Sequence, residues 1–126
     1  METIIIATTK DVTIEQFIIT IPDSFKKEKQ PDGRFFVSSD THHCWIGYDD
    51  EIEFDYDEDE MIIVRKHIPN PIFFTCEFTE IEFGKEILSY IIFDERFVID
   101  NDYGELLTGD EFIKKLKEEP DWDWRI

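Results

Sequence analysis

Three consecutive residues, His42, His43 and Cys44, are the strongest candidates for catalysis in the sequence. With Asp40 nearby, they could supply a nucleophile and its base, or ligands for a transition metal. Residues two apart on a strand point the same way but do not converge on one reacting atom, so the spacing favours strand packing over catalysis. His67 stands alone and is expected to be an ordinary surface or rim histidine.

Calcium binding is suggested by Asp55, Asp57 and Asp59, which have the one-three-five spacing of an EF-hand loop. The rest of that loop is missing. Glu60 stands where the loop needs glycine, and Lys66 stands where it needs the closing glutamate. The pattern therefore predicts no specific calcium site.

A second acidic set, Asp100, Asp102 and Glu111, fails for a related reason, because Gly104 removes the fifth-position ligand. The sequence also lacks GxSxG, HExxH and a glycine-rich phosphate loop. Its 31 acids allow glycosidase-like carboxylate pairs, but no sequence spacing favours such a pair over a solvated surface. We therefore predict no catalytic residue, no metal and no cofactor.

The elements that position these residues follow from hydrophobic periodicity and helix-capping signals. Strands are predicted at residues 3–7, 35–37, 44–48, 72–78 and 97–100, with a mobile loop at residues 26–33 and turns at residues 40–41 and 101–104. Capping boxes predict helix starts at Thr13, Thr79 and Thr108. The first begins a short helix, the second an amphipathic helix over residues 80–93, and the third a last helix that ends at Pro120. Gly84, on the apolar face of helix 80–93, would permit close approach to a strand.

These elements predict a single α+β domain spanning residues 1–126. It would be a mostly antiparallel sheet with two amphipathic helices packed on one face and a short N-terminal helix. The chain has no uninterrupted apolar run of about eighteen residues and no basic start to a secretory signal, so we expect a cytoplasmic protein. Cys44 and Cys76 are expected to be free, buried thiols.

Charge is the most unusual property of the chain. The 31 acids and 13 bases give a net charge of −18, which argues against nucleic acid or an anionic membrane as partner. Between Asp40 and Val64 there are ten acids and no lysine or arginine, and nine of these acids lie in residues 49–60, hereafter the acidic segment. A basic protein is the natural complement.

Within the acidic segment, Ile52, Phe54 and Tyr56 alternate with acids, which is the period of a strand. Residues 57–60 then resemble a turn into a second strand at residues 61–64. Together with the strand at 44–48, these would form a three-stranded meander with one strongly anionic face or edge.

Two interpretations of this charge stay open. Charged strand faces commonly keep a sheet soluble and protect its edge. However, nine acids without a compensating base repel one another more than solubility requires, and aromatic residues beside a field of one sign are typical of protein interfaces. The terminal Trp122 and Trp124 either dock on the body or remain exposed for a partner.

The last third of the chain resembles the closing region of uncharacterised families found in bacterial toxin-immunity loci. The similar segments are residues 97–104, residues 110–112 (Asp-Glu-Phe) and residues 119–122 (Glu-Pro-Asp-Trp), which follow the amphipathic helix. In length, acidity and aromatic content the whole chain also resembles the small immunity proteins that neutralise polymorphic or contact-dependent toxins. The resemblance implies a toxin partner, in many cases a nuclease with a basic active site.

We therefore predict an immunity protein that occludes a basic toxin sterically and electrostatically. Its predicted partner-binding residues are Tyr48, Asp49, Glu51, Glu53, Asp55, Tyr56, Asp57, Glu58, Asp59, Trp122 and Trp124. Two alternatives stay open. One is an adaptor or regulatory domain that binds another basic protein or mimics DNA. The other, the least expected, is a small enzyme using His42, Cys44 or a carboxylate pair.

Overall fold

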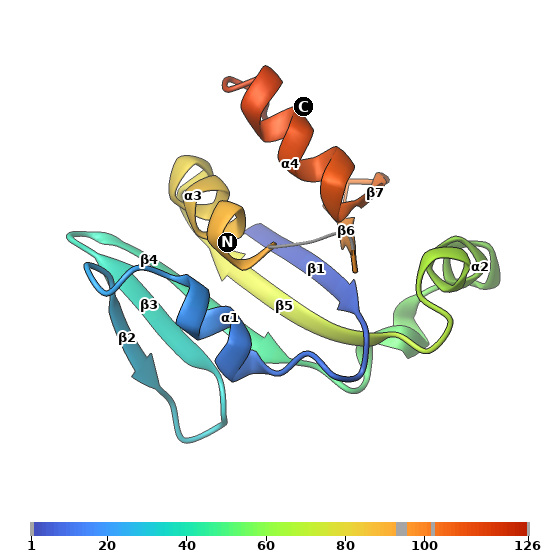
Figure 1. The fold of residues 1–126 in the computed structure, drawn as a ribbon, viewed down its shortest axis with the longest axis horizontal. Coiled ribbons are helices and arrows are strands. Elements are labelled where there is room, and N and C mark those ends of the chain that lie inside the picture. Colours follow the sequence, from blue (N-terminus) through green and yellow to red (C-terminus); the bar gives the residue numbers. More distant parts are fainter. Residues whose placement is uncertain (1, 93–95, 102, 126) are drawn as a thin grey trace.

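The structure, a computed structural model, describes residues 2–92, 96–101 and 103–125. Within them the chain alternates strands and helices around one sheet (Figure 1). The elements are β1 (Glu2–Thr8), α1 (Ile14–Thr20), β2 (Lys26–Lys29), β3 (Phe35–Ser39), β4 (His42–Tyr48), the 3-10 helix η1 (Ile52–Asp55), α2 (Glu58–His67), β5 (Ile72–Phe78), α3 (Ile81–Ile91), β6 (Phe97–Asp100), β7 (Leu106–Thr108) and α4 (Gly109–Glu118).

All seven strands belong to one antiparallel sheet with the order β2-β3-β4-β5-β1-β6-β7. Strand β1 lies inside the sheet between β5 and β6, a position that suits its run of β-branched residues. The predicted α+β class with a mostly antiparallel sheet is confirmed.

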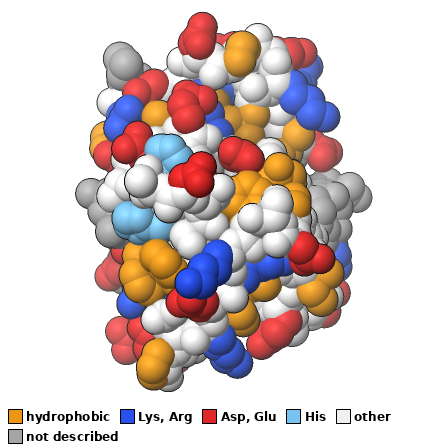
Figure 2. All heavy atoms as spheres, turned by 90° about the vertical axis from the view of Figure 1, so that its left-hand side faces the viewer, with side chains coloured by type: hydrophobic (Ala, Val, Ile, Leu, Met, Phe, Trp, Pro, Cys, Tyr) orange, Lys and Arg blue, Asp and Glu red, His pale blue; other side chains and the backbone are white. Residues whose placement is uncertain are grey.

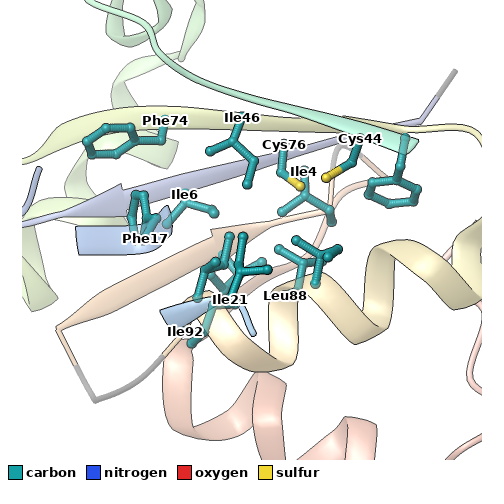
Figure 3. Packing of buried hydrophobic residues seen from close by; sticks show 14 of the residues in the cluster. Ile4, Ile6, Phe17, Ile21, Cys44, Ile46, Phe74, Cys76, Leu88 and Ile92 are labelled. Atoms are coloured by element: carbon teal, nitrogen blue, oxygen red, sulfur yellow. The ribbon is translucent and has the colours of Figure 1, made fainter. Parts of the chain in front are cut away.

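Helices α1, α3 and α4 cover one face of the sheet, and the main core lies between them. Figure 3 shows Ile4, Ile6, Cys76 and Phe74 on the sheet side of this core, with Leu88 of α3 below. These side chains alternate along their strands with residues that face the other way, which is the period-two pattern of a strand with one fully buried face.

The second face of the sheet is covered by η1 and α2 over part of its area. A smaller apolar cluster forms there, and its buried members are Ala7, Ile52, Met61, Val64, Ile68, Phe73 and Val98. Figure 1 shows α2 at the right-hand side, apart from α1, α3 and α4. The sheet is thus the middle layer of an unequal sandwich.

The prediction that Gly84 permits close packing is confirmed. A Cβ atom on Gly84 would lie 2.6 Å from the ring of Phe78 on β5. Capping boxes at Thr13 and Thr108 are confirmed, but Thr79 does not cap α3. The N-cap residue is Glu80, one position later, and it makes no side-chain capping bond.

The predicted hairpin over residues 51–64 is wrong, because this segment forms η1 and α2. Asp57 caps α2 by accepting a hydrogen bond from the Glu60 backbone nitrogen (2.8 Å), and the Glu60 side chain accepts one from the Asp57 nitrogen (3.3 Å). Acids then occupy the first turn and Arg65, Lys66 and His67 the last turn, which suits the helix dipole. A three-stranded meander containing residues 51–64 therefore does not form.

The predicted mobile loop at residues 26–33 is also wrong in its first half, which forms the edge strand β2 against β3. Its charged side chains are typical of an edge that must not pair with another chain. The Lys27 ammonium donates hydrogen bonds to the carbonyls of Ile18 and Ile21 at the end of α1, at 3.3 and 2.7 Å. These bonds tie β2 to the body.

Cys44 and Cys76 are free and fully buried, as predicted. They lie on the neighbouring strands β4 and β5, and Figure 3 shows their sulfur atoms pointing toward one another in the core. A hydrogen bond with Cys44, together with burial, raises the pKa of the Cys76 thiol well above its ordinary value. Both cysteines pack as small buried core residues.

Candidate partner-binding surface

The acidic segment begins where β4 ends and lies against part of the second face of the sheet. Ile52 is buried against that face, and the ring of Tyr56 packs on Phe73 with centroids 5.6 Å apart. The Tyr56 hydroxyl donates a hydrogen bond to the Asp100 carboxylate (2.7 Å) at the end of β6. These contacts hold the segment in one place and direct its remaining side chains outward.

The nine carboxylates of the acidic segment have no ion-pair partner among the described residues. The salt bridges of the described chain instead use acids outside this segment, such as Asp11 with Arg96 and Asp32 with Arg34. Inside the segment the carboxylates accept only local backbone bonds, as Asp49 does from the Glu51 nitrogen (2.9 Å) and the capping pair of α2 does. Most of the carboxylates of the acidic segment therefore face solvent, and none is neutralised by an ion pair with a described residue.

Exposed apolar side chains lie within the acidic segment or next to it in the sequence. Phe54 is 79% exposed, Ile62 is 63% exposed and Tyr48 is 56% exposed. Ile63 on the same helix is exposed as well. Large apolar residues beside unpaired charges of one sign favour a protein-binding surface. We call the exposed parts of residues 48–63 the acidic surface.

The opposite end of the molecule has a different character. In Figure 2, which shows the end formed by β2, β3 and β4, lysine and arginine side chains are interspersed with acids, and histidines lie beside hydrophobic groups. His42 stacks on Phe83 with centroids 5.6 Å apart, and His43 lies at the same distance from Phe36. Both histidines thus pack against aromatic rings, as the sequence predicts for residues on a strand.

The structure sorts the predicted partner-binding residues into two groups. Tyr48 and the acids of the predicted set lie on the acidic surface, namely Asp49, Glu51, Glu53, Asp55, Asp57, Glu58 and Asp59. Tyr56 also belongs to the segment, but its ring faces the sheet and its role is to anchor the segment.

Trp122 and Trp124 do not share this surface. Trp124 is 2% exposed and packs against Phe78 and Phe112 in the main core, on the other face of the sheet. Trp122 is half-buried against Phe112, with the Lys115 ammonium 4.5 Å from its ring. The tail is docked, so Trp124 is not available as an anchor for a partner, and Trp122 lies away from the acids.

Sequence reasoning missed Ile62 and Ile63 as exposed residues. The signal that could have found them is the capping box of Asp57 and Glu60. Once a helix starts there, Met61 and Val64 face the sheet, and the two isoleucines between them must face outward.

No protein-family model, curated protein or solved structure matches the chain. In the described part of the chain, no three His, Cys, Asp or Glu side chains are arranged to hold a metal ion. Asp55 lies in η1 and Asp57 caps α2, so the first calcium pattern is not a loop. Asp102 of the second pattern lies outside the described residues. None of the described helices has the length and apolar character needed to span a bilayer.

Proposed function

We propose that this chain is an immunity protein that binds a cognate secreted toxin through the acidic surface and blocks the toxin's basic active site. The observation that supports the proposal most is the set of nine carboxylates in residues 49–60 without an ion-pair partner in the described structure. The resemblance of the last third of the chain to proteins of toxin-immunity loci points the same way.

Unpaired charges of one sign cost the folded chain stability. Like charges held on η1 and the first turn of α2 repel one another and lower the stability of the folded state, while a much smaller net charge would keep the chain soluble. A basic partner removes that repulsion on binding, and the field speeds the encounter. Phe54 and Ile62 supply the apolar contact that charges alone do not give.

The acidic surface would then inhibit the toxin by covering its active site. A nuclease groove that holds phosphates is lined with lysine and arginine, so an acidic surface of this kind competes with the nucleic acid for the same cations. The inhibitor itself needs no cofactor and no catalytic residue. A toxin that cleaves nucleic acid inside the cell must be bound by its inhibitor in the same compartment. We therefore propose that the protein acts in the cytoplasm.

The first experiment is coexpression with the C-terminal domain of the protein encoded immediately upstream. Cell survival and copurification are measured together. We expect survival and a stable complex. If the upstream product is harmless and nothing copurifies, the immunity proposal fails. A complex with a basic protein that is not toxic would instead favour an adaptor or regulatory domain.

A quadruple variant tests the surface itself. Glu51→Gln, Asp55→Asn, Glu58→Gln and Asp59→Asn neutralise exposed acids that form no ion pair with any residue the structure describes. We expect association with the toxin domain at low salt to slow by about tenfold or more, measured by stopped-flow mixing.

The matched control removes the same amount of charge on the other side of the sheet. It carries Glu80→Gln, Glu86→Gln, Glu118→Gln and Asp121→Asn, all exposed positions. A control variant that slows association as much as the first would show that net charge, and not the acidic surface, drives binding.

A further inference from the structure

Two adjoining hollows lie at the end of the sheet where β4 leads into the acidic segment. They share Lys10, Tyr48 and Ile72 and have volumes of about 270 and 540 Å³. We call them together the Tyr48 groove. The larger hollow is mainly apolar, with walls formed by Val12, Ile14, Tyr48, Ile72 and Phe74.

Local structure fixes these walls. The Tyr48 ring meets Phe74 edge-on with centroids 5.6 Å apart, yet more than half of the tyrosine surface stays exposed. The Asp49 nitrogen donates a hydrogen bond to the Phe73 carbonyl (3.0 Å), which sets the start of the acidic segment beside β5. The groove is therefore formed before any partner arrives, which keeps the cost of ordering it low.

The smaller hollow carries charge. Asp49, Asp50 and Glu53 line it on the side of η1, while Lys10, in the turn after β1, and Arg65 of α2 line it on the other side. None of the five forms an ion pair with a described residue. A cationic side chain entering this hollow is attracted toward η1 and repelled from the other rim, so the charges orient it.

We propose that the Tyr48 groove is the anchor site of the acidic surface. It accepts one aromatic side chain of the basic partner against Ile14, Tyr48 and Ile72, and a neighbouring lysine or arginine of the partner pairs with Asp49, Asp50 and Glu53. Interfaces commonly concentrate their binding energy where an aromatic residue fills a preformed pocket surrounded by polar groups. The inference rests on the proposed function, because it assumes a basic protein partner.

The test uses a peptide, so that it does not depend on finding the toxin. Acetyl-Lys-Phe-Lys-amide is titrated into the intact ¹⁵N-labelled chain, and amide shifts are followed by NMR. We expect shifts confined to residues 10–14, 48–53 and 72–74. Acetyl-Lys-Gly-Lys-amide, which lacks the ring, should bind about fivefold more weakly, and acetyl-Glu-Phe-Glu-amide should bind more weakly than both.

Variants locate the effect. Tyr48→Ala should weaken binding of the Lys-Phe-Lys peptide about fivefold, as expected for the loss of one aromatic contact. The double variant Lys10→Glu and Arg65→Glu should strengthen it, because it removes the two repelling cations. Ile19→Ala, an exposed apolar site on α1 outside the groove, is the control and should change nothing.

Shifts centred elsewhere on the molecule, or equal binding of the Phe and Gly peptides, would overturn the inference. Failure here is distinguishable from failure of the proposed function. Suppose that the unmodified chain and the Tyr48→Ala variant both protect cells and bind the toxin domain with the same affinity. The groove is then not the anchor, although the immunity proposal stands. If the peptide binds as expected and coexpression does not protect, the groove serves another basic partner.

Discussion

Two single residues of α3 determine how the helix packs on the sheet and how the C-terminal tail is attached to it. Gly84 lets α3 pack tightly on β5, because the space that a side chain at this position would occupy is filled by the Phe78 ring. On the same side of the sheet, Lys85 donates a hydrogen bond to the Pro120 carbonyl (3.0 Å) and so attaches the tail to α3. Gly84 thus sets the packing of α3 on β5, and Lys85 links α3 to the tail 35 residues further along the chain.

Gly84→Ala should destabilise the protein, although alanine favours a helix more than glycine does. The added methyl group would lie 2.6 Å from the Phe78 ring, so α3 or the ring must move, at a cost of about 1–3 kcal/mol. Urea unfolding measures the change. Ser89→Ala, on the exposed side of α3, is the control, and an equal or greater loss there would contradict the packing argument.

Asp123 should titrate far below an ordinary aspartate. The Arg125 guanidinium donates hydrogen bonds to both of its carboxylate oxygens, at 2.8 and 2.6 Å, and lowers the pKa of Asp123 from 3.8 to about 2. Since the folded pKa is the lower one, the stabilisation is fully present above the ordinary value and is lost as the pH falls toward about 2.

NMR titration of the Asp123 side-chain carboxyl measures this midpoint directly. Arg125→Gln should return the midpoint toward 3.8, the ordinary value. A midpoint near the ordinary value in the unmodified chain would show that the pair does not form in solution.

At the scale of elements, η1 and α2 form the layer that carries the acidic surface. Helix α2 is short and exposes much of its length, so its capping box and its contacts with the sheet must hold it. Met61 and Val64 bury one side of the helix, and the Tyr56 hydroxyl bonded to Asp100 fixes the chain that leads into it. The acids stay together in space because this layer is attached at several points.

Asp57→Ala should cost about 1 kcal/mol of stability through loss of the α2 cap. Hydrogen exchange should show the largest loss of protection in α2. Glu58→Ala removes the same charge one position later without removing the cap, and its effect should stay within about 0.5 kcal/mol. Equal effects of the two variants would mean that charge, and not capping, decides the stability of α2.

At the scale of the whole molecule, charge is distributed unevenly across the sheet. Residues 1–35 carry six acids and five bases, whereas residues 49–60 carry nine acids and no base. The described ion pairs lie outside the acidic segment, so repulsion is concentrated on the layer of η1 and α2. The folded chain therefore has one strongly anionic side.

Added sodium chloride should raise the midpoint of thermal unfolding, because screening at a Debye length of about 10 Å near 0.1 M weakens repulsion between the acids. The quadruple variant at positions 51, 55, 58 and 59 should gain less from salt than the unmodified chain. Scanning calorimetry over a series of salt concentrations measures both. A salt response that is identical in the two proteins would place the repulsion elsewhere.

Local signals predicted much of the fold. Runs of β-branched and aromatic residues predicted β1, β5 and β6, and the capping boxes at Thr13 and Thr108 predicted the starts of α1 and α4. The error at residues 51–64 also has a local cause. Ile52 and Tyr56 are four apart, a spacing that fits a helical turn as well as a strand, and Phe54 between them faces solvent.

The amino-acid sequence by itself determined the charge of the candidate surface, since nine of the twelve residues 49–60 are acids and none is a base. Only the tertiary structure decided which large side chains accompany them. Trp124 is buried and Phe54 is exposed because burial depends on contacts between elements that are far apart in the sequence. A local sequence pattern does not specify those contacts. The same long-range packing brought Lys10, Tyr48 and Ile72 to one groove from three separate parts of the chain.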